Sequence, residues 1–537
     1  MKAIITQEIK KTLIKLKYYD KDIDIHITVP KNKEFGDLST NISFLLAKKL
    51  SKNPLEIASN IQQNLESLKI FKSINIAGAG FLNFTINPDS IVNYINDIIK
   101  LGKDYGKKKA HNKKVLIEFV SANPTGPLTV GHGRGAILGD TLSNIFEWNG
   151  YKVEREYYYN NAGRQMRILG DSVKARYLDL IGEKNEFPEE GYQGDYIYDI
   201  AEQLFKKHGD SLKTKNEIFK DYAEKFIFDN IKNTLKNIGI IFDSFFNEKT
   251  LYENKDIYKV IEALDKKELI YNKDGAVWFK GTQVGRESDR VLIKNSGEPT
   301  YRLPDMAYHI DKMERGYDLC VDIFGADHMD AYPDILEVVH QLGFDESKIK
   351  VLIHQFISIL KDGKQVKMST RKATYITLDE LIEQVGSDVV RYFFIMRGIN
   401  SHLNFDLDIA KEKSDKNPIY YIQYANARIN TILNTNDINI DNYNLSLLNQ
   451  ENEIKLIYKL INFKDTIAKV RQIMEPQILA NYLLELSSMF HKYYSKNRII
   501  NEDDIELTKA RLIFIQAISI VITNGLNILG ISAPESM

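Results

Sequence analysis

The chain has 537 residues, with 72 Lys and Arg against 73 Asp and Glu and a formal net charge of −1. At about 150 residues per domain, this length predicts three or four domains. The charge balance excludes a histone-like protein that holds nucleic acid by bulk charge. The single cysteine, Cys320, excludes an internal disulfide and a cysteine zinc site. Neither segment 1–19 nor the apolar run 512–522 has the pattern of a signal peptide or a membrane span, so we expect a soluble, cytoplasmic protein.

The first 105 residues have the pattern of a small α+β domain. Apolar residues recur every three or four positions over 5–16, which predicts a helix, and the alternation over 23–29 predicts a strand. Asn53 followed by Pro54 is typical of an N-cap and first helical turn. Strands interrupted by two glycines are expected over 74–86.

Residues 106–400 are expected to form a doubly wound parallel sheet. A lysine-rich stretch over 107–114 precedes it and fits a solvated linker better than a nucleic-acid patch. A helix is predicted from about Gly133, and a mostly helical insertion over about 165–270 interrupts the sheet. Thr377 and Glu380 form a capping box that begins another helix. The strands of the interrupted and resumed sheet are predicted at 115–120, 153–159, 276–279, 291–293, 319–324 and 351–360.

Residues 401–537 are expected to form an all-α bundle. Apolar residues occur at helical spacing from about residue 417 onward, and 512–529 supplies a final apolar helix. The organisation predicted is therefore an N-terminal α+β domain, an α/β domain with a helical insertion, and a helical C-terminal domain.

Two stretches carry residues suited to chemistry, and the first is 118–135. It combines a strand end, a loop with two prolines and a glycine-rich helix start that contains His132. Amides at a helix start favour an anion, so this arrangement indicates a phosphate site. The alternatives are tight turning with close helix–strand packing, or a dinucleotide site. The spacing of Gly131, Gly133 and Gly135 is wrong for the latter.

The second stretch, 364–372, is a basic segment after a predicted strand and an Asp-Gly turn. A cationic loop that folds over a triphosphate would stabilise charge on a pyrophosphate leaving group. A solvated basic turn is the alternative, because most charge runs lie in solvent.

Together, these two stretches resemble the two ATP signatures of class I aminoacyl-tRNA synthetases, the HIGH-type and KMSKS-type motifs. The finer resemblance is to the arginyl-tRNA synthetase family, and it covers essentially the whole chain. The blocks that carry it are 35–41, 118–135, 159–163, 301–305, 325–328, 417–425 and 529–535.

This resemblance implies a class I, Rossmann-like catalytic domain and a reaction in two steps. The arginine carboxylate attacks the α-phosphate of ATP, and the arginyl group then passes to the terminal ribose of tRNA(Arg). Mg²⁺ would accompany ATP as part of the substrate, no separate metal site is expected, and the family is usually monomeric. The resemblance implies catalytic roles for His132, Lys367 and Arg371, and ATP contacts from Thr129, Gly131, His132, Gly133, Gly135, Lys367, Met368 and Ser369.

The resemblance also implies an arginine pocket. A guanidinium offers five donors in a planar fork, so carboxylates are its natural partners. Glu118 and Asp305 match the family's guanidinium-binding acids. Without the resemblance, an N-cap after Pro304 would be the better explanation of Asp305, and core packing the better explanation of Tyr301. The full set of implied arginine-binding residues is Glu118, Ser121, Asn123, His132, Tyr301, Asp305 and His328.

For tRNA, the resemblance assigns the N-terminal domain to the outer corner of the L-shaped molecule and the C-terminal bundle to the anticodon. Tyr420, Tyr424 and Arg428 are the implied tRNA-binding residues, since aromatics and arginine stack on unpaired bases. These three residues lie at helical spacing and could instead pack in the core of the bundle. A chain with almost no net charge must segregate its charges to bind a polyanion, so one face of it should be basic.

The chain departs from the family pattern at two positions. Thr129 stands where the first signature usually has histidine, and Thr370 where the second often has lysine. Three other assignments remain open at this stage: a cysteinyl or glutamyl synthetase, a nucleotidylyltransferase, and a non-catalytic tRNA-binding protein derived from a synthetase.

Overall fold

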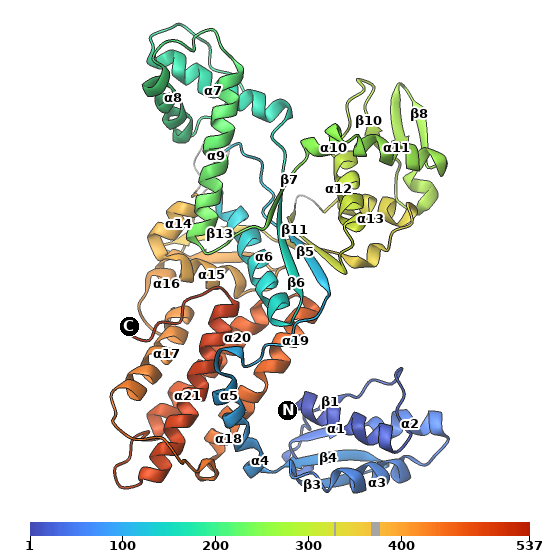
Figure 1. Ribbon diagram of the computed structural model, residues 1–537, viewed down its shortest axis with the longest axis vertical. Coiled ribbons are helices and arrows are strands. Elements are labelled where there is room, and N and C mark those ends of the chain that lie inside the picture. Colours follow the sequence, from blue (N-terminus) through green and yellow to red (C-terminus); the bar gives the residue numbers. More distant parts are fainter. Residues whose placement is uncertain (327–328, 367–375) are drawn as a thin grey trace.

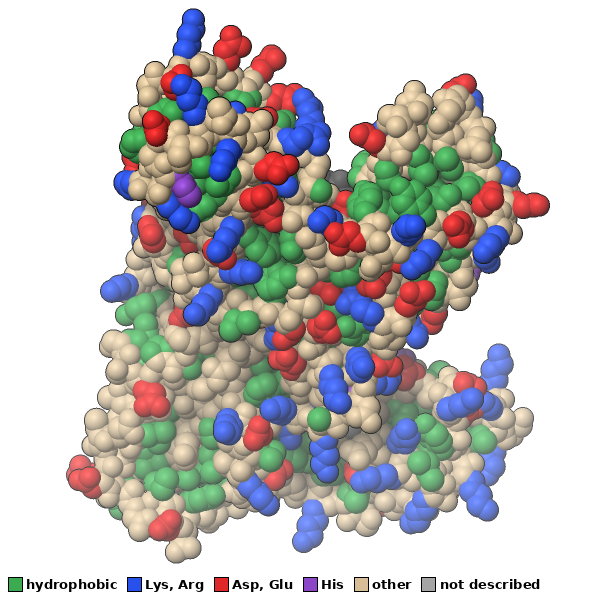
Figure 2. Space-filling view, turned by 45° about the horizontal axis from the view of Figure 1, so that its top comes forward, with side chains coloured by type: hydrophobic (Ala, Val, Ile, Leu, Met, Phe, Trp, Pro, Cys, Tyr) green, Lys and Arg blue, Asp and Glu red, His purple; other side chains and the backbone are tan. Residues whose placement is uncertain are grey.

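The computed structural model describes residues 1–326, 329–366 and 376–537. Figure 1 shows an N-terminal domain beside a helical bundle, with a central sheet and two lobes above them. Figure 2 shows a deep notch between these two lobes. Within the described ranges, no helix combines the length and the apolar composition needed to cross a bilayer.

The N-terminal domain is an antiparallel sheet in the order β1-β2-β4-β3, covered by helices. The Asn53 side chain accepts the Leu55 backbone N–H at 2.9 Å, so the predicted N-cap is confirmed. The strand expected over 23–29 is wrong in extent, because only Ile27 and Thr28 have partners on the short β2. The elements are α1 (Lys2–Lys15), β1 (Ile27–Thr28), β2 (Leu38–Thr40), α2 (Ile42–Leu50), α3 (Pro54–Leu65), β3 (Phe71–Ala77) and β4 (Phe81–Ile86).

Two short helices, α4 (Pro88–Val92) and α5 (Tyr94–Leu101), lead to the lysine-rich stretch. The lysines over 107–114 are exposed. The backbone of this stretch is nevertheless tied down, because Lys108 and His111 donate their N–H groups to the carbonyls of Trp148 and Gly150. It is therefore an ordered connection along the catalytic domain.

The central sheet is parallel throughout, in the order β12-β11-β5-β6-β7. It confirms the predicted β-loop-α-β start, and α6 packs against β5, β6 and β11. The strand predicted over 351–360 divides in two, because Gln355 and Phe356 belong to neither half. The elements are β5 (Lys114–Glu118), α6 (Val130–Trp148), β6 (Lys152–Tyr159), β7 (Ser244–Asn247), β11 (Leu319–Gly325) and β12 (Ile349–His354).

The segment predicted as a mostly helical insertion is mostly helical, but a strand of the central sheet interrupts it. Three helices, α7 (Gly163–Leu180), α8 (Asp195–His208) and α9 (Glu217–Asn237), form one lobe in Figure 1. The chain then returns to the central sheet as β7, which pairs with β6 in parallel. Part of the sheet therefore lies inside the segment expected to be an insertion.

The strands predicted at 276–279 and 291–293 exist, but they do not belong to the central sheet. They form a separate antiparallel sheet, β10-β9-β8, in the second lobe. Asp274 and Gly275 both have positive φ, which is the hairpin turn that joins β8 to β9. This lobe contains α10 (Lys249–Glu253), α11 (Asp256–Lys266), β8 (Ile270–Lys273), β9 (Ala276–Phe279), β10 (Arg290–Ile293), α12 (Arg302–Glu314) and α13 (Tyr332–Gln341).

A third small sheet, β14-β13-β15, leads into the C-terminal bundle. The Thr377–Glu380 capping box at the start of α14 is confirmed, as is the all-α character of the bundle. These elements are β13 (Ile357–Lys361), β14 (Lys364–Gln365), α14 (Leu378–Val385), α15 (Ser387–Ile395), β15 (Leu403–Asp406), α16 (Leu407–Lys411), α17 (Pro418–Asn434), α18 (Glu451–Ile461), α19 (Phe463–Ile473), α20 (Gln477–Lys496) and α21 (Ile505–Ile528).

The buried side chain of Arg391 forms hydrogen bonds with three separate regions of the chain. Arg391 on α15 donates to the carbonyls of Leu529 and Ile238, both at 2.9 Å, and to the carboxylate of Asp140 on α6. Its side chain is 1% exposed. The C-terminal tail, the end of the helical lobe and α6 therefore share one guanidinium.

Candidate active site

The chain makes a strained turn directly after β5. Val120 and Ser121 both have positive φ, at 68° and 45°, a conformation that costs non-glycine residues of order 1–3 kcal/mol each. The Ser121 hydroxyl donates to Glu118 at 2.8 Å and accepts the Tyr158 backbone N–H at 3.2 Å. The turn thus holds Ser121 between the ends of two neighbouring strands.

A buried ion cluster lies behind this turn. Lys312 on α12 is fully buried, and its ammonium donates to Glu118 and to Asp322, both at 2.6 Å. Burial alone would lower the pKa of Lys312, but the two carboxylates raise it above its ordinary value. Burial opposes ionisation of Asp322 as well, yet Lys312 and His309 hold its pKa well below the usual range. Glu118 therefore already shares one cation with Asp322.

Asp305 lies one helical turn before His309 on α12. Burial raises its pKa to about 7, with further contributions from the nearby carboxylates of Glu118 and Glu248. Among the described residues, none forms an ion pair with Asp305. The N-cap position of α12 is Tyr301, so Asp305 is not a cap. A carboxylate with these properties is suited to a cation brought by a ligand.

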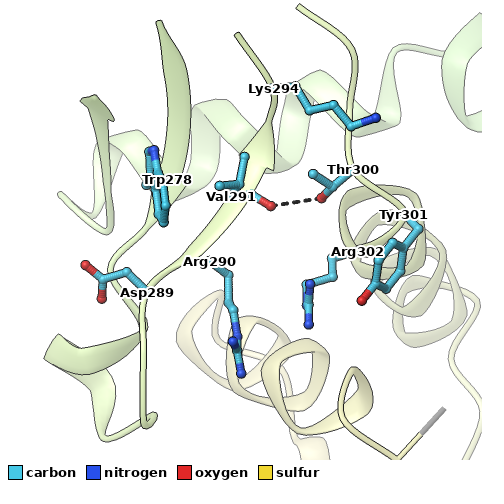
Figure 3. Close-up of a pocket in the computed structure, with 8 residues that line it drawn as sticks. All are labelled: Trp278, Asp289, Arg290, Val291, Lys294, Thr300, Tyr301 and Arg302. Atoms are coloured by element: carbon cyan, nitrogen blue, oxygen red, sulfur yellow. Dashed lines mark hydrogen bonds between the residues drawn. The ribbon is translucent and has the colours of Figure 1, made fainter. Parts of the chain in front are cut away.

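Tyr301 is 63% exposed, so the core-packing alternative is wrong. Its ring centre lies 4.9 Å from the Arg302 guanidinium carbon. Asn123 is exposed as well, and its side-chain oxygen accepts the Asn160 backbone N–H at 3.0 Å. Asn123 thus lies at the end of the sheet beyond β5 and β6, whereas Tyr301 lies beside the end of β10 (Figure 3).

Glu248 is a third acid that the sequence reasoning missed. It follows β7 and accepts hydrogen bonds at 2.7 Å from the Tyr158 hydroxyl and from the Asn160 amide. Burial raises the pKa of Glu248 above its ordinary value despite these bonds. No local motif marks Glu248, and only its place after a sheet-edge strand could have indicated it.

At the start of α6, the packing accounts for two of the three glycines in the glycine-rich stretch. The Thr129 backbone N–H donates to His132 Nδ1 at 3.2 Å, so in a neutral ring Nε2 carries the proton. A Cβ on Gly133 would lie 2.7 Å from Leu378, and one on Gly135 would lie 3.1 Å from His354. Both glycines therefore permit close packing, which was the alternative to a phosphate role. Gly131 is exposed.

The flanks of the two signature stretches meet. Thr129 forms an isolated antiparallel bridge with Thr377, and the Leu378 N–H donates to the Leu128 carbonyl at 2.9 Å. The described chain that resumes at residue 376 is thereby held beside the start of α6. The predicted site residues His328, Lys367, Met368, Ser369 and Arg371 lie outside the described residues. Within the described part of the chain, no group of three or more His, Cys, Asp or Glu is arranged to hold a metal ion.

The predicted tRNA-binding residues form one partly exposed cluster on α17 and α20. Tyr420 and Tyr424 stack with ring centres 6.1 Å apart. The Arg428 guanidinium lies 4.6 Å from the Tyr424 ring and 4.8 Å from the Tyr494 ring. Because these side chains are only half-buried, core packing does not fully account for them.

Comparisons with known families cover nearly the full length. Residues 3–86 match the arginyl-tRNA synthetase N-terminal domain, and residues 94–391 match the class I (R) tRNA synthetase catalytic domain. Residues 422–537 match the DALR anticodon binding domain.

Individual proteins agree with these matches. The arginine–tRNA ligase of Desulfotalea psychrophila is 47% identical, over 95% of this chain and 94% of its own length. That of Chlorobaculum tepidum is also 47% identical, over 96% of both chains. The arginyl-tRNA synthetase structure from Thermus thermophilus covers both chains fully with a TM-score of 0.78 at 19% identity, which is a likeness of fold.

Proposed function

The chain belongs to the arginyl-tRNA synthetase family, and from this premise we propose how its residues divide the work of an arginine–tRNA ligase. Membership excludes the cysteinyl, glutamyl and nucleotidylyltransferase assignments. It also implies ATP as the activating substrate. We propose that Mg²⁺ arrives with ATP, since this hard cation prefers phosphate oxygens.

The observation that carries the residue assignment is the partly buried carboxylate of Asp305, which has no ion-pair partner among the residues that the structure describes. A guanidinium placed against it would supply the missing cation and lower its pKa. Glu118 contributes its remaining acceptor capacity, because Lys312 and Ser121 already donate to it. Glu248 adds negative charge to the same pocket, and Tyr301 borders it.

Ser121, Asn123 and His328 are proposed to hold the amino and carboxylate ends of arginine. Ser121 is supported by its fixed position at the strained turn, and Asn123 by its place at the rim of the sheet. Arginine would then lie with its guanidinium toward α12 and its carboxylate toward the start of α6, where ATP is bound.

At the start of α6, His132 is proposed to donate its Nε2 proton to the phosphates of ATP. Thr129 supports this role, because its backbone N–H holds the ring nitrogen that must accept. Lys367, Ser369 and Arg371 are proposed to close over the same phosphates, and the Thr129–Thr377 bridge supports the meeting of the two segments. Most of the acceleration then comes from alignment and charge stabilisation.

Amino-acid-dependent pyrophosphate exchange tests this proposal. Exchange is expected with arginine in the presence of tRNA, and not with citrulline, which has nearly the same shape but no charge. Robust exchange with another amino acid would contradict the pocket assignment. No exchange under any condition would favour the alternative of a non-catalytic tRNA-binding protein.

His132→Ala is expected to lower turnover by about 100- to 1000-fold, the size typical of losing one transition-state donor. His132→Asn is the matched variant, because it retains a side-chain donor. Turnover in His132→Ala equal to that of the wild type would remove His132 from the catalytic set.

Finally, we propose that the protein is a cytoplasmic monomer. Light scattering of the purified chain would test the monomeric state.

A further inference from the structure

The helical lobe formed by α7, α8 and α9 touches the loop that carries the proposed substrate contacts, and the residue assignments above give this lobe no role. We call residues 121–128, between β5 and α6, the substrate loop. It contains Ser121 and Asn123, which are proposed to hold arginine, and it leads directly into Thr129 and His132, where ATP is proposed to bind. Figure 1 shows the lobe above α6.

The two ends of the substrate loop are tied to the body of the catalytic domain. Near its first end, the Tyr157 hydroxyl on β6 donates to the Ala122 carbonyl at 2.8 Å. At its second end, the Leu378 N–H at the start of α14 donates to the Leu128 carbonyl at 2.9 Å. Between these points the loop has neither helix nor strand and contains two prolines, which have no N–H to donate. Its middle therefore needs support from elsewhere.

The helical lobe supplies this support. Tyr196, in the first turn of α8, donates its hydroxyl to the Thr125 carbonyl at 2.9 Å. Tyr192, four residues earlier, interacts with the Thr125 side chain. A Cβ on Gly126 would lie 3.1 Å from the Tyr196 hydroxyl oxygen, so glycine at this position permits the close approach. Two tyrosines of the lobe thus meet one short segment in the middle of the substrate loop.

Tyr196 belongs to a helix that is firmly packed in the lobe. α8 lies along α7, and the apolar side chains that follow Tyr196 are fully buried, namely Ile197, Ile200 and Leu204. Closely packed helices keep their geometry, whereas a loop without regular structure is free to vary unless it is held. The lobe is therefore the fixed partner in this contact, and the substrate loop is the part that is positioned.

We propose that Tyr196 is a positioning residue for arginine activation, because its hydrogen bond fixes the middle of the substrate loop and so sets how bound arginine faces bound ATP. This inference rests on the proposed function. The contact lies between Asn123 and Thr129, and each end of the loop keeps its own anchor when the contact is lost. Loss of the bond should therefore impair the alignment of the two substrates more than the binding of either, and rate is highly sensitive to alignment.

Pyrophosphate exchange with the full chain tests the proposal, since it yields kcat and KM separately. Tyr196→Phe keeps the ring and removes only the donor. At saturating tRNA it should lower kcat by about 3- to 10-fold, the size of one neutral hydrogen bond, while the KM values for arginine and ATP stay within about twofold. Tyr198→Phe is the matched control on the same helix, because Tyr198 is exposed and its ring contacts Arg176. This control should leave kcat and both KM values unchanged.

Gly126→Ala tests the same contact from the side of the loop. The added Cβ would displace the Tyr196 hydroxyl from the Thr125 carbonyl, so this variant should also lower kcat. In the Tyr196→Phe background that hydroxyl is absent, and Gly126→Ala should then have little further effect on kcat. A double-mutant cycle measures this dependence. Effects of the two substitutions that simply multiply would contradict the proposal.

The proposal is overturned if Tyr196→Phe leaves kcat unchanged, including the case in which only its Tm falls, since Tyr196 would then support the fold alone. It is also overturned if direct titration shows weaker tRNA binding while kcat at saturating tRNA is kept, because the lobe would then act as a tRNA contact. An unchanged Tm with a lowered kcat is the expected result. Absence of arginine-dependent exchange in the wild type would instead refute the proposed function.

Discussion

Two ion clusters lie along α12, and their compositions are reversed. Toward its C-terminal end, one buried cation, Lys312, is shared by the carboxylates of Glu118 and Asp322. At its start, one buried carboxylate, Asp334, is shared by three arginines, including Arg302. Asp305 lies between them and forms no ion pair with any described residue. The acidic excess therefore faces one end of the helix and the basic excess faces the other.

This reversal places the acidic groups on the side of α12 where the arginine guanidinium is proposed to bind. A buried ion pair adds little stability by itself, but removing one partner leaves a buried charge without compensation. The following substitutions test each cluster separately.

The largest expected effect is on stability. Lys312→Met leaves Glu118 and Asp322 without their shared cation, and should lower the free energy of unfolding by about 3–5 kcal/mol. Urea unfolding measures this loss. Lys266→Met, on an exposed position of α11, is the matched control and should change stability by less than about 0.5 kcal/mol. A loss below about 1 kcal/mol for Lys312→Met would show that the cluster does not hold α12 in place.

Asp305→Asn should raise the KM for arginine by about 100-fold, because the guanidinium would lose its charged partner in a partly buried site. The KM for ATP should stay within about threefold. Steady-state exchange at varied arginine and at varied ATP separates the two values. An unchanged KM for arginine would remove Asp305 from the pocket.

The third prediction concerns pH. With a pKa of about 7 before arginine binds, Asp305 is mostly protonated at pH 6 and mostly ionised at pH 8. Arginine affinity should therefore rise about tenfold over this interval, with release of a proton. Calorimetry in buffers of different ionisation heat measures both quantities. Asp305→Asn should lose this dependence.

The same shift affects stability without arginine. The folded chain keeps the Asp305 proton at pH values where the unfolded chain, with its ordinary pKa near 4, has lost it. Stability due to Asp305 should thus fall as pH rises from about 4 to about 7 and then level off. The difference between wild type and Asp305→Asn isolates this contribution. A difference that is constant over this interval would contradict the raised pKa.

The smallest expected effect concerns the arginines that share Asp334. Arg290→Gln and Arg286→Gln each leave Asp334 with two of its three guanidinium partners. Each substitution should therefore lower the free energy of unfolding by less than about 1 kcal/mol, the size of a partly exposed charge contact. Urea unfolding measures both losses. A loss above about 3 kcal/mol in either variant would mean that this arginine alone compensates the buried carboxylate.

Much of the fold followed from periodicity and local signals. The long apolar strands, the capping box at Thr377 and the C-terminal helices are all local patterns, and the structure confirms them. The edge strand β7 was missed because it stands between long helices in a segment that we assigned to a helical insertion. The β8–β9 hairpin was missed although Asp274–Gly275 is a typical hairpin turn, because we assigned the neighbouring strands to the larger sheet.

The site was predictable only in part. His132 and Asp305 stand in motifs, so their sequence context identified them. Lys312 and Glu248 stand in none, and their importance depends on which carboxylates the fold places beside them. A buried lysine has the same local sequence pattern as a surface lysine, so pairing across 194 residues with Glu118 could not be anticipated.

The shared guanidinium of Arg391 has a consequence for how this chain can be divided. A chain that ends before Leu529 would remove one of its acceptors and leave a buried charged donor without a partner. The isolated catalytic region should therefore fold poorly, and the last residues act as part of its core. Any displacement of the tail would also reach α6 through Asp140, so Arg391 is one of the side chains that couple the C-terminal domain to this helix.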